Sequence, residues 1–138
     1  AKKPAFSNAS RARRCLILCS GFYEWSKDLE GNKIPWFIKR NDNAPMVFGG
    51  VWQEWSDESG TIKTCAIVTT ASNSKLSRIH HRLPLILERS DWGLWLGEEG
   101  HGASALMKPT ADDTLKAYRV SKNINSNRSC GPDLMSPL

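Results

Sequence analysis

The chain has 138 residues, 40% of them hydrophobic, and a formal net charge of +5 at pH 7. This length fits one domain with a real hydrophobic core and leaves little room for two. No apolar stretch approaches the ~18 residues of a membrane-spanning helix, and the basic start of the chain lacks the apolar segment of a secretory signal. We therefore expect a single soluble, cytoplasmic domain over residues 1–138, with no membrane partner.

The positive charge is concentrated at the start of the chain. Residues 1–40 hold nine Lys and Arg against three acidic residues, whereas residues 41–138 hold ten against eleven. A one-sided basic surface is typical of proteins that bind a polyanion, with nucleic acid the first candidate. On charge alone, an ordinary solvated basic face remains equally compatible.

Short runs of β-branched and aromatic residues, separated by polar turns, dominate the first half of the chain and predict strands. The runs are RCLILCSGFYEW (14–25), IPWFIKR (34–40), PMVFGGVWQEW (45–55) and IKTCAIVTT (62–70). The segments between them are rich in the Gly, Asn, Asp and Ser that turns require. This pattern predicts an antiparallel meander of at least four strands.

The segment SDWGLWLGEE begins a different pattern. Ser90 is placed to cap a helix and Asp91 to occupy its first turn, while Trp92, Trp95 and Leu96 follow at helical spacing. We expect a short amphipathic helix here.

Further along, HGASALMK (101–108) predicts a second short helix closed by Pro109, residues 110–113 could start a third turn, and AYRVS (117–121) predicts a late strand. Together the elements predict an α+β domain that is mainly antiparallel sheet with short peripheral helices.

Four cysteines could indicate a zinc site or a disulfide framework. Cys15 and Cys19 bracket LIL in a predicted strand and Cys65 opens CAIV, so these three are expected to be small buried hydrophobic residues. Cys130 lies in the polar tail. We expect no metal and no other cofactor.

Six tryptophans are many for a chain of this length. Most are expected in the core, and one or two could instead be stacking platforms for unpaired bases. The sequence does not separate these uses.

Glu24 lies in GFYEW near the end of a predicted strand. Because side chains alternate along a strand, Glu24 shares a face with Phe22 and opposes Tyr23 and Trp25. A carboxylate that points where an aromatic ring also points could donate or accept a proton. From the residues alone, a salt bridge to a nearby arginine is the simpler interpretation.

Two adjacent histidines, His80 and His81, stand between Arg78 and Arg82. On extended backbone their rings point to opposite sides, so only one of them can face a given site. Histidine is the side chain best suited to proton transfer near neutral pH, and the two arginines could hold a phosphate. A loop histidine on a basic surface is the competing interpretation.

At this point a family resemblance becomes visible over nearly the whole chain. In order, the sequence resembles the SRAP (SOS response-associated peptidase) family in the blocks KPAF, RRCLILCSGFYEW, PWFI, GGVWQEW, AIVTTASN, IHHRLPLIL, DWGLWL and VSKNINSNR…DLMSPL. The resemblance implies an open barrel of mainly antiparallel strands. It also implies single-stranded DNA with abasic sites as the partner, a monomer, and a nucleoid-associated location.

The resemblance further implies that an N-terminal cysteine, exposed by removal of the initiator methionine, closes a thiazolidine ring on the sugar aldehyde. Glu24 then matches the glutamate that assists methionine removal and Schiff-base chemistry. His80, rather than His81, matches the family histidine. Arg82 matches an arginine that contacts DNA phosphate, and Thr69 matches a residue lining the site.

The sequence departs from the family pattern at its start. Ala1 lies two positions before the start of KPAF, so the family's opening segment, with the nucleophilic cysteine and an asparagine, is not among these residues. Each of the four cysteines has its nitrogen in a peptide bond, so none offers the free amine of a thiazolidine. We therefore predict that this polypeptide alone does not form the crosslink. Two alternatives stay open: a non-catalytic single-stranded DNA-binding remnant, and a partial domain that folds poorly alone.

Overall fold

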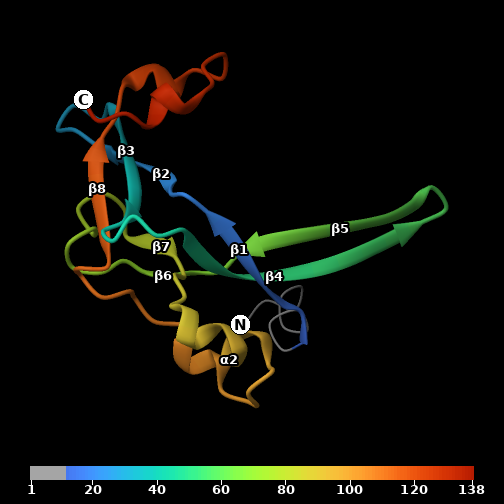
Figure 1. Cartoon of the computed structure of the whole chain (residues 1–138). Coiled ribbons are helices and arrows are strands. Elements are labelled where there is room, and N and C mark those ends of the chain that lie inside the picture. The colour runs from blue at the N-terminus through green and yellow to red at the C-terminus, as the bar shows by residue number, and fades with distance from the viewer. Residues whose placement is uncertain (1–11) are drawn as a thin grey trace. The chain divides into compact units, whose positions relative to one another are not determined.

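The computed structural model describes residues 12–138 and divides the chain into two compact units, each described here by itself (Figure 1). Unit 1 comprises Ala1–Leu18, Val47–Thr70 and Pro84–Pro109, and unit 2 comprises Cys19–Met46, Ala71–Leu83 and Thr110–Leu138. The expectation of a single domain stays a prediction.

Eight strands and one short α-helix make up the regular structure of residues 12–138. The strands are β1 (Arg14–Cys19), β2 (Phe22–Lys27), β3 (Lys33–Arg40), β4 (Met46–Asp57), β5 (Gly60–Ile67), β6 (Thr69–Ala71), β7 (Arg82–Pro84) and β8 (Leu115–Arg119). The helix is α2 (Trp92–Leu96), and the 3₁₀ turns are η1 (Arg89–Asp91), η2 (Ala103–Leu106), η3 (Lys122–Asn125) and η4 (Pro132–Met135). The predicted α+β class with mainly antiparallel sheet is confirmed.

The sheet of unit 1 has the strand order β1-β4-β5. β4 and β5 form a long antiparallel hairpin, paired from Gly50 opposite Ile67 to Asp57 opposite Gly60, and they run as a two-stranded ribbon in Figure 1. On the other side of β4, the Trp52 N–H donates a 2.8 Å hydrogen bond to the carbonyl oxygen of the residue preceding β1. β4 is therefore the central strand of this sheet.

The core of unit 1 forms around Trp95 of α2, which is 2% exposed and packs with Leu85 and Leu87. Its indole N–H donates a 3.0 Å hydrogen bond to the carbonyl of Cys15, which satisfies the one polar group of this buried ring. Gly49 of β4 belongs to the same packing, because a Cβ there would lie 2.7 Å from a methyl group of Leu85. The tryptophan thus ties α2 to the sheet of its own unit.

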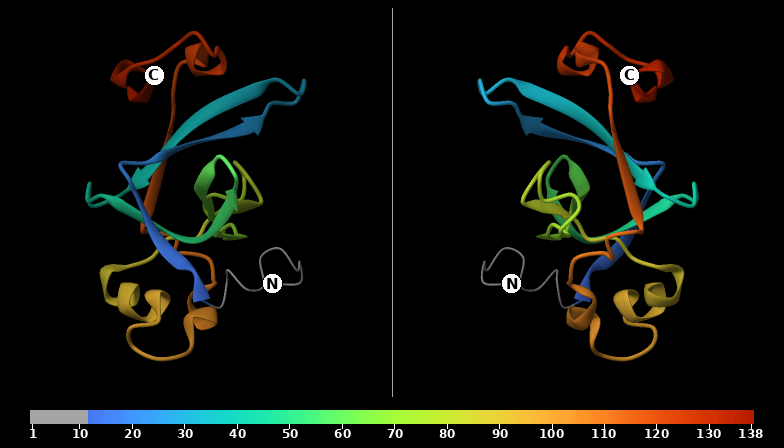
Figure 2. Two further views of the ribbon diagram at one scale, coloured as in Figure 1. Left: turned by 90° about the vertical axis from the view of Figure 1, so that its right-hand side faces the viewer. Right: turned by 90° about the vertical axis from the view of Figure 1, so that its left-hand side faces the viewer.

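The sheet of unit 2 has the order β2-β3-β8 and is antiparallel throughout, with β3 between its two neighbours in Figure 1. Figure 2 shows the same three strands from two further sides. One face carries a row of rings: Tyr23, Phe37 and Tyr118 are Cα partners across the three strands, with centroid distances of 5.2 and 5.7 Å. The hydroxyl group of Tyr118 donates a 2.6 Å hydrogen bond to the carbonyl oxygen of Met135. The opposite face carries Glu24.

The predicted four-strand meander is wrong in its connections. The run 14–25 is two strands, and β1 is a neighbour of β4 while β2 pairs with β3 in another sheet. The break falls at Ser20 and Gly21. A Cβ on Gly21 would lie 2.5 Å from the Phe37 ring and 2.6 Å from the main-chain oxygen of Ile38, so the chain changes direction where only glycine fits.

The helix prediction is correct in place and wrong in its start. The 3₁₀ turn η1 precedes α2, and Asp91, not Ser90, is the capping residue, without a side-chain cap. The helix ends at Gly97, whose φ of 82° lets its N–H reach back to carbonyl oxygens of the last turn. The expected second helix, 101–108, is the 3₁₀ turn η2.

The short strands β6 and β7 pair with each other, and the boundary between the units falls within both. On the unit 1 side, the Leu85 N–H donates to the carbonyl oxygen of Val68; on the unit 2 side, the Ser72 N–H donates to the carbonyl oxygen of His81.

Among the helices of residues 12–138, none is long and apolar enough to cross a membrane.

Candidate functional site

Glu24 lies in the middle of β2 directly opposite Trp36 of β3. Because Cα partners in an antiparallel pair project to the same side of the sheet, the carboxylate and the indole share one face. Glu24 is half-buried, and its Oε1 accepts a 3.2 Å hydrogen bond from the main-chain N–H of Trp25. The Trp36 N–H donates to Ser26 Oγ at 2.8 Å, which holds the indole over β2.

Arg78 extends the same group of residues. Its guanidinium carbon lies 4.9 Å from the centroid of the Trp36 ring, within the range of a cation–π contact. Arg119 of β8 is the Cα partner of Trp36 on the other side of β3. Trp36 therefore has a carboxylate on one neighbouring strand, an arginine on the other and a second arginine over its ring.

The loop that carries Arg78 is held by Asn73, which is 6% exposed. The Asn73 Oδ1 accepts a 2.9 Å hydrogen bond from the Leu76 N–H, and Ser74 Oγ donates a 2.6 Å hydrogen bond to Asp112 Oδ2. Leu76 and Ile79 are buried, so their side chains anchor the loop while Arg78 stays exposed. The local hydrogen bonds and these two anchors set the position of the basic segment.

His80 follows at the end of this loop. Its Nδ1 lies 2.8 Å from the carbonyl oxygen of Arg82 and 3.1 Å from the Arg82 amide nitrogen, so this ring nitrogen is committed to the main chain in either tautomer. The expectation that the two histidine rings point to opposite sides is wrong. The His80 and His81 rings stack, with centroids 4.7 Å apart and planes at 21°, because residues 74–79 form turns and His80 is not in a strand.

The predicted site residues thus form two neighbouring groups in unit 2. Glu24 and Arg78 meet at Trp36, and His80 is bonded to Arg82, the first residue of β7. Arg78 and His80 are two residues apart in one loop, which links the groups through the chain. Thr69, the first residue of β6, belongs to unit 1, and its contribution to the site stays a prediction.

The cysteines are less buried than expected. Cys15 and Cys19 are half-buried, and burial raises the pKa of both thiols. Cys65 is exposed, contrary to expectation, because it lies on the projecting strand β5. Cys130 is exposed as well. Among the described residues, no group of three or more His, Cys, Asp and Glu side chains could hold a metal ion.

Trp36 is the site residue that the sequence did not single out. Its signal was available: in IPWFIKR, alternation places Trp36 and Ile38 on one face, and an antiparallel partner strand can bring Glu24 to the same face. The register that brings the two residues together is set by the turn between β2 and β3. The composition of residues 26–33, SKDLEGNK, predicts where this turn lies but not its geometry.

The opposite face of the same hairpin carries an open pocket of about 250 Å³, lined by Trp25, Lys33, Ile124 and Asn125. The Trp25 indole N–H donates a 2.6 Å hydrogen bond to Asn125 Oδ1. The polar edge of this ring is therefore held by Asn125 of η3, and Trp25 and Asn125 both line the pocket.

Comparison with known proteins places this geometry in a family. Residues 1–127 match the family described as SOS response associated peptidase (SRAP). The chain is 33% identical over 138 residues to the abasic site processing protein YoaM of Bacillus subtilis and 30% identical over 134 residues to the abasic site processing protein YMR114C of Saccharomyces cerevisiae. These matches cover 97% and 91% of this chain, and 61% and 36% of those proteins.

A crystal structure of a protein from Bacteroides thetaiotaomicron is also similar, with a TM-score of 0.88 and 27% identity. The match covers 99% of this chain and 62% of that one, so the chain spans about three fifths of the length of that protein and of YoaM. On the extent of the family match, the chain belongs to the SOS response associated peptidase (SRAP) family.

Proposed function

We propose that this chain takes part in processing abasic sites in single-stranded DNA. One observation carries the proposal: a half-buried carboxylate, Glu24, stands beside a tryptophan ring, Trp36, that is covered by the guanidinium of Arg78. An acid–base group beside an aromatic ring and a cation suits a nucleic acid strand with a reactive sugar. Family membership and relatives named abasic site processing proteins support the same interpretation.

The chemistry requires proton transfers near neutral pH. An abasic deoxyribose reacts as its open-chain aldehyde, and condensation with an amine expels one water molecule after the carbinol oxygen has gained a proton. Glu24 is proposed to exchange these protons. His80 is proposed to act through Nε2, because its Nδ1 is bonded to the main chain of Arg82. Both residues are proposed as catalytic groups.

The DNA backbone is proposed to contact Arg78 and Arg82. Thr69, the first residue of β6, is proposed as a further DNA-binding residue on the basis of its match to the family. Arginine binds phosphate oxygens through several N–H groups in a planar arrangement, and such contacts carry no sequence information. Arg78 and Arg82 are both exposed, so DNA can approach both side chains from solvent. A strand held through its phosphates can present any abasic position.

The covalent step needs a thiol and a free amine on one residue. Cys15, Cys19, Cys65 and Cys130 all have acylated nitrogens, and the raised thiol pKa values of the first two make them poor nucleophiles. The 138-residue polypeptide is therefore proposed to bind abasic DNA without forming the thiazolidine. Non-catalytic binding of single-stranded DNA is the second candidate function, and it is favoured by the two arginines next to Trp36, Arg78 over its ring and Arg119 on the neighbouring strand.

The test is the affinity of the chain for a fluorescent single-stranded oligonucleotide, measured by anisotropy as a function of salt. Arg78→Gln is expected to weaken binding and to lower the slope of log K against log salt by about 0.7, the value of one phosphate contact on a single strand. Arg89→Gln is the matched control, since Arg89 stacks 5.9 Å from Trp92 in a comparable arginine–tryptophan pair in unit 1. Equal effects of the two substitutions, or no binding by the unmodified chain, would refute the proposal.

A further inference from the structure

A second tryptophan with cations around its ring lies in the sheet of unit 1. Trp52 is on the central strand β4. Its main-chain N–H donates a hydrogen bond to the carbonyl oxygen of Arg13 on one side, and Lys63 lies on β5 on the other side. The Arg13 guanidinium carbon lies 6.0 Å from the Trp52 ring centroid, and Lys63 Nζ lies 5.7 Å from it. Two cations, one on β5 and one just before β1, thus approach one half-buried ring.

This face of the sheet is open to solvent. Cys65 is the Cα partner of Trp52 and is exposed, and Ile67, two residues along the same strand and on the same face, is 43% exposed. β4 and β5 continue beyond this point as a two-stranded ribbon (Figure 1). A flat ligand can therefore reach the Trp52 ring.

The chemistry of this group fits an unpaired nucleotide. An aromatic ring binds any base by stacking, since every base has a π-face, and flanking cations bind the phosphates on either side. Arginine and lysine alone would suit any polyanion, and an exposed tryptophan alone would suit any apolar partner. A tryptophan on the central strand with one cation on each side of that strand favours a partner with alternating flat and anionic groups.

We propose that Trp52 is a stacking platform for an unpaired base, and that Arg13 and Lys63 hold the flanking phosphates of a single-stranded nucleic acid. The inference rests on the proposed function and deepens it, because it assigns a DNA contact in unit 1 that is separate from the residues around Trp36. The contact reads no sequence. It raises affinity for any single strand, whether or not the strand carries an abasic site.

An acidic residue, Glu54, lies on the same face as this group and reduces its positive charge. Glu54 is the Cα partner of Lys63, so its carboxylate stands on the same face and offsets part of the lysine charge. Removing that charge should strengthen binding of a polyanion. We expect Glu54→Gln to raise the affinity for single-stranded DNA.

Trp55 provides the matched control. It lies three residues from Trp52 on the same strand, so its side chain projects to the other face of the hairpin. Its Cα partner is Ile62, and the residue is 59% exposed. Trp55 is thus more accessible than Trp52. Among the described residues, no lysine or arginine lies over its ring. If nonspecific contact with exposed tryptophan explained DNA binding, Trp55 would contribute at least as much.

The test compares Trp52→Ala, Trp52→Phe and Trp55→Ala for binding to an oligothymidine without an abasic site, with thermal unfolding as a check on folding. Trp52→Ala should weaken binding about tenfold, the effect expected for losing one stacked base. Trp52→Phe should retain most of the affinity, and Trp55→Ala all of it. Unchanged affinity in Trp52→Ala, or an equal loss in Trp55→Ala, would overturn the inference.

Lys63→Gln keeps the test valid if Trp52→Ala does not fold. This exposed substitution should reduce the salt slope, and an unchanged slope would count against the platform. The two proposals fail differently. If Arg78→Gln weakens binding while Trp52→Ala and Lys63→Gln do not, only the Trp52 inference is wrong; if the unmodified chain binds no single strand, both are wrong.

Discussion

At the scale of single residues, the candidate site depends on Trp36. Its indole N–H is held by Ser26, its ring supports Arg78, and its strand partner is Glu24. A cation–π contact at a partly exposed site contributes ~0.5–1 kcal/mol, enough to favour one orientation of an arginine side chain. Trp36 is therefore a positioning residue for the guanidinium.

This role predicts coupling between Trp36 and Arg78. Trp36→Ala should weaken single-stranded DNA binding, because the arginine loses its support, and Arg78→Gln in addition should weaken binding less than it does alone. A double-mutant cycle on anisotropy affinities measures this. Strictly additive losses would show that the two residues act independently.

Gly21 gives a prediction about stability. A Cβ there would lie 2.5 Å from the Phe37 ring and 2.6 Å from the Ile38 carbonyl oxygen, and the main chain cannot move away easily. We expect Gly21→Ala to destabilise the protein by ~1–3 kcal/mol, the usual range for overpacking. Urea unfolding would measure this, with the neighbouring exposed substitution Ser20→Ala as control. A loss in Gly21→Ala no larger than in Ser20→Ala would contradict the packing argument.

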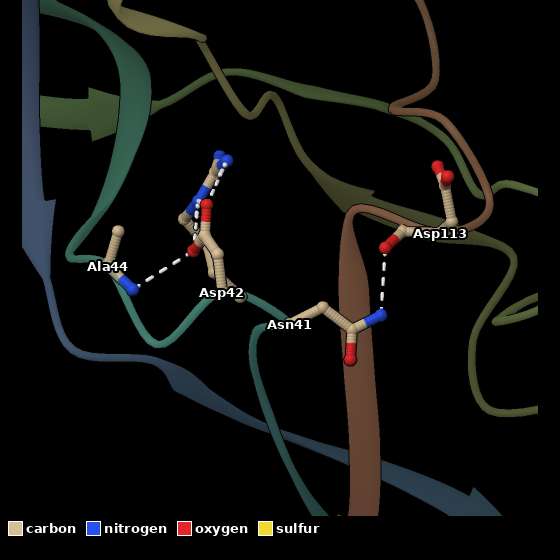
Figure 3. A network of polar contacts seen from close by, with 5 residues as sticks. Asn41, Asp42, Ala44 and Asp113 are labelled. Atoms are coloured by element: carbon tan, nitrogen blue, oxygen red, sulfur yellow. Dashed lines mark hydrogen bonds and ion pairs between the residues drawn. The ribbon is translucent and has the colours of Figure 1, made fainter.

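At the scale of elements, the connection from β3 to β4 is held by a polar network (Figure 3). The Asp42 carboxylate accepts hydrogen bonds from Arg40, 3.0 Å from its Nη2, and from the Ala44 N–H at 2.9 Å. Asn41 donates to the carbonyl oxygen of Asp113 at 2.8 Å. The turn is thereby joined to the residues just before β8, within unit 2.

The network gives the protein a defined dependence on acid. The hydrogen bonds from Arg40, followed by that from Ala44, lower the pKa of Asp42 from 3.8 to about 2. A carboxyl whose folded pKa is below its unfolded value contributes stability above the unfolded pKa, and this contribution is lost as pH falls through the folded value. The contribution of Asp42 is therefore complete above about pH 5 and is lost as pH falls through about 2.

We expect Asp42→Asn to be less stable than the unmodified chain at pH 6, with the difference shrinking between pH 4 and pH 2. Urea unfolding at several pH values measures this. Asp113→Asn is the control, since Asp113 enters the network through its main-chain carbonyl. A difference that is constant with pH would contradict the assignment of the effect to the Asp42 charge.

Elements with clear alternation and polar boundaries were predictable from sequence. β3 was expected at 34–40 and found at Lys33–Arg40, because IPWFIKR lies between two turn-rich segments. The run 14–25 was not divided correctly, because Ser20 and Gly21 do not look like a turn within a run of apolar residues. The need for glycine there comes from Phe37, which is distant in sequence.

The roles of the site residues stay a prediction, whereas the arrangement of their side chains can be compared with expectation. Resemblance to the SRAP family pointed to Glu24, His80 and Arg82, whereas alternation alone gave the wrong arrangement of His80 and His81. The stacking of the two rings depends on the turns of residues 74–79, which are stabilised by Asn73, and such loop geometry has no periodic signal.

At the scale of the whole molecule, each unit contains a sheet with a tryptophan and basic side chains on one face: Trp36 with Arg78 in unit 2, and Trp52 with Arg13 and Lys63 in unit 1. The basic residues concentrated in the first forty positions contribute Arg13. The candidate acid–base residues, Glu24 and His80, both lie in unit 2. We therefore expect DNA affinity to depend on both units and chemistry on unit 2.

The most direct test of the proposed function uses single-stranded DNA with one abasic site. The 138-residue chain is compared with a version extended at its N-terminus by a family-like segment that begins with cysteine and carries the asparagine, and each is scored for native gel shift and for denaturant-resistant adduct. The account predicts that both shift the DNA, that only the extended version forms the adduct, and that Glu24→Gln or His80→Ala reduces its yield. A cysteine-dependent adduct with the 138-residue chain itself, or no adduct with the extended version, would contradict it.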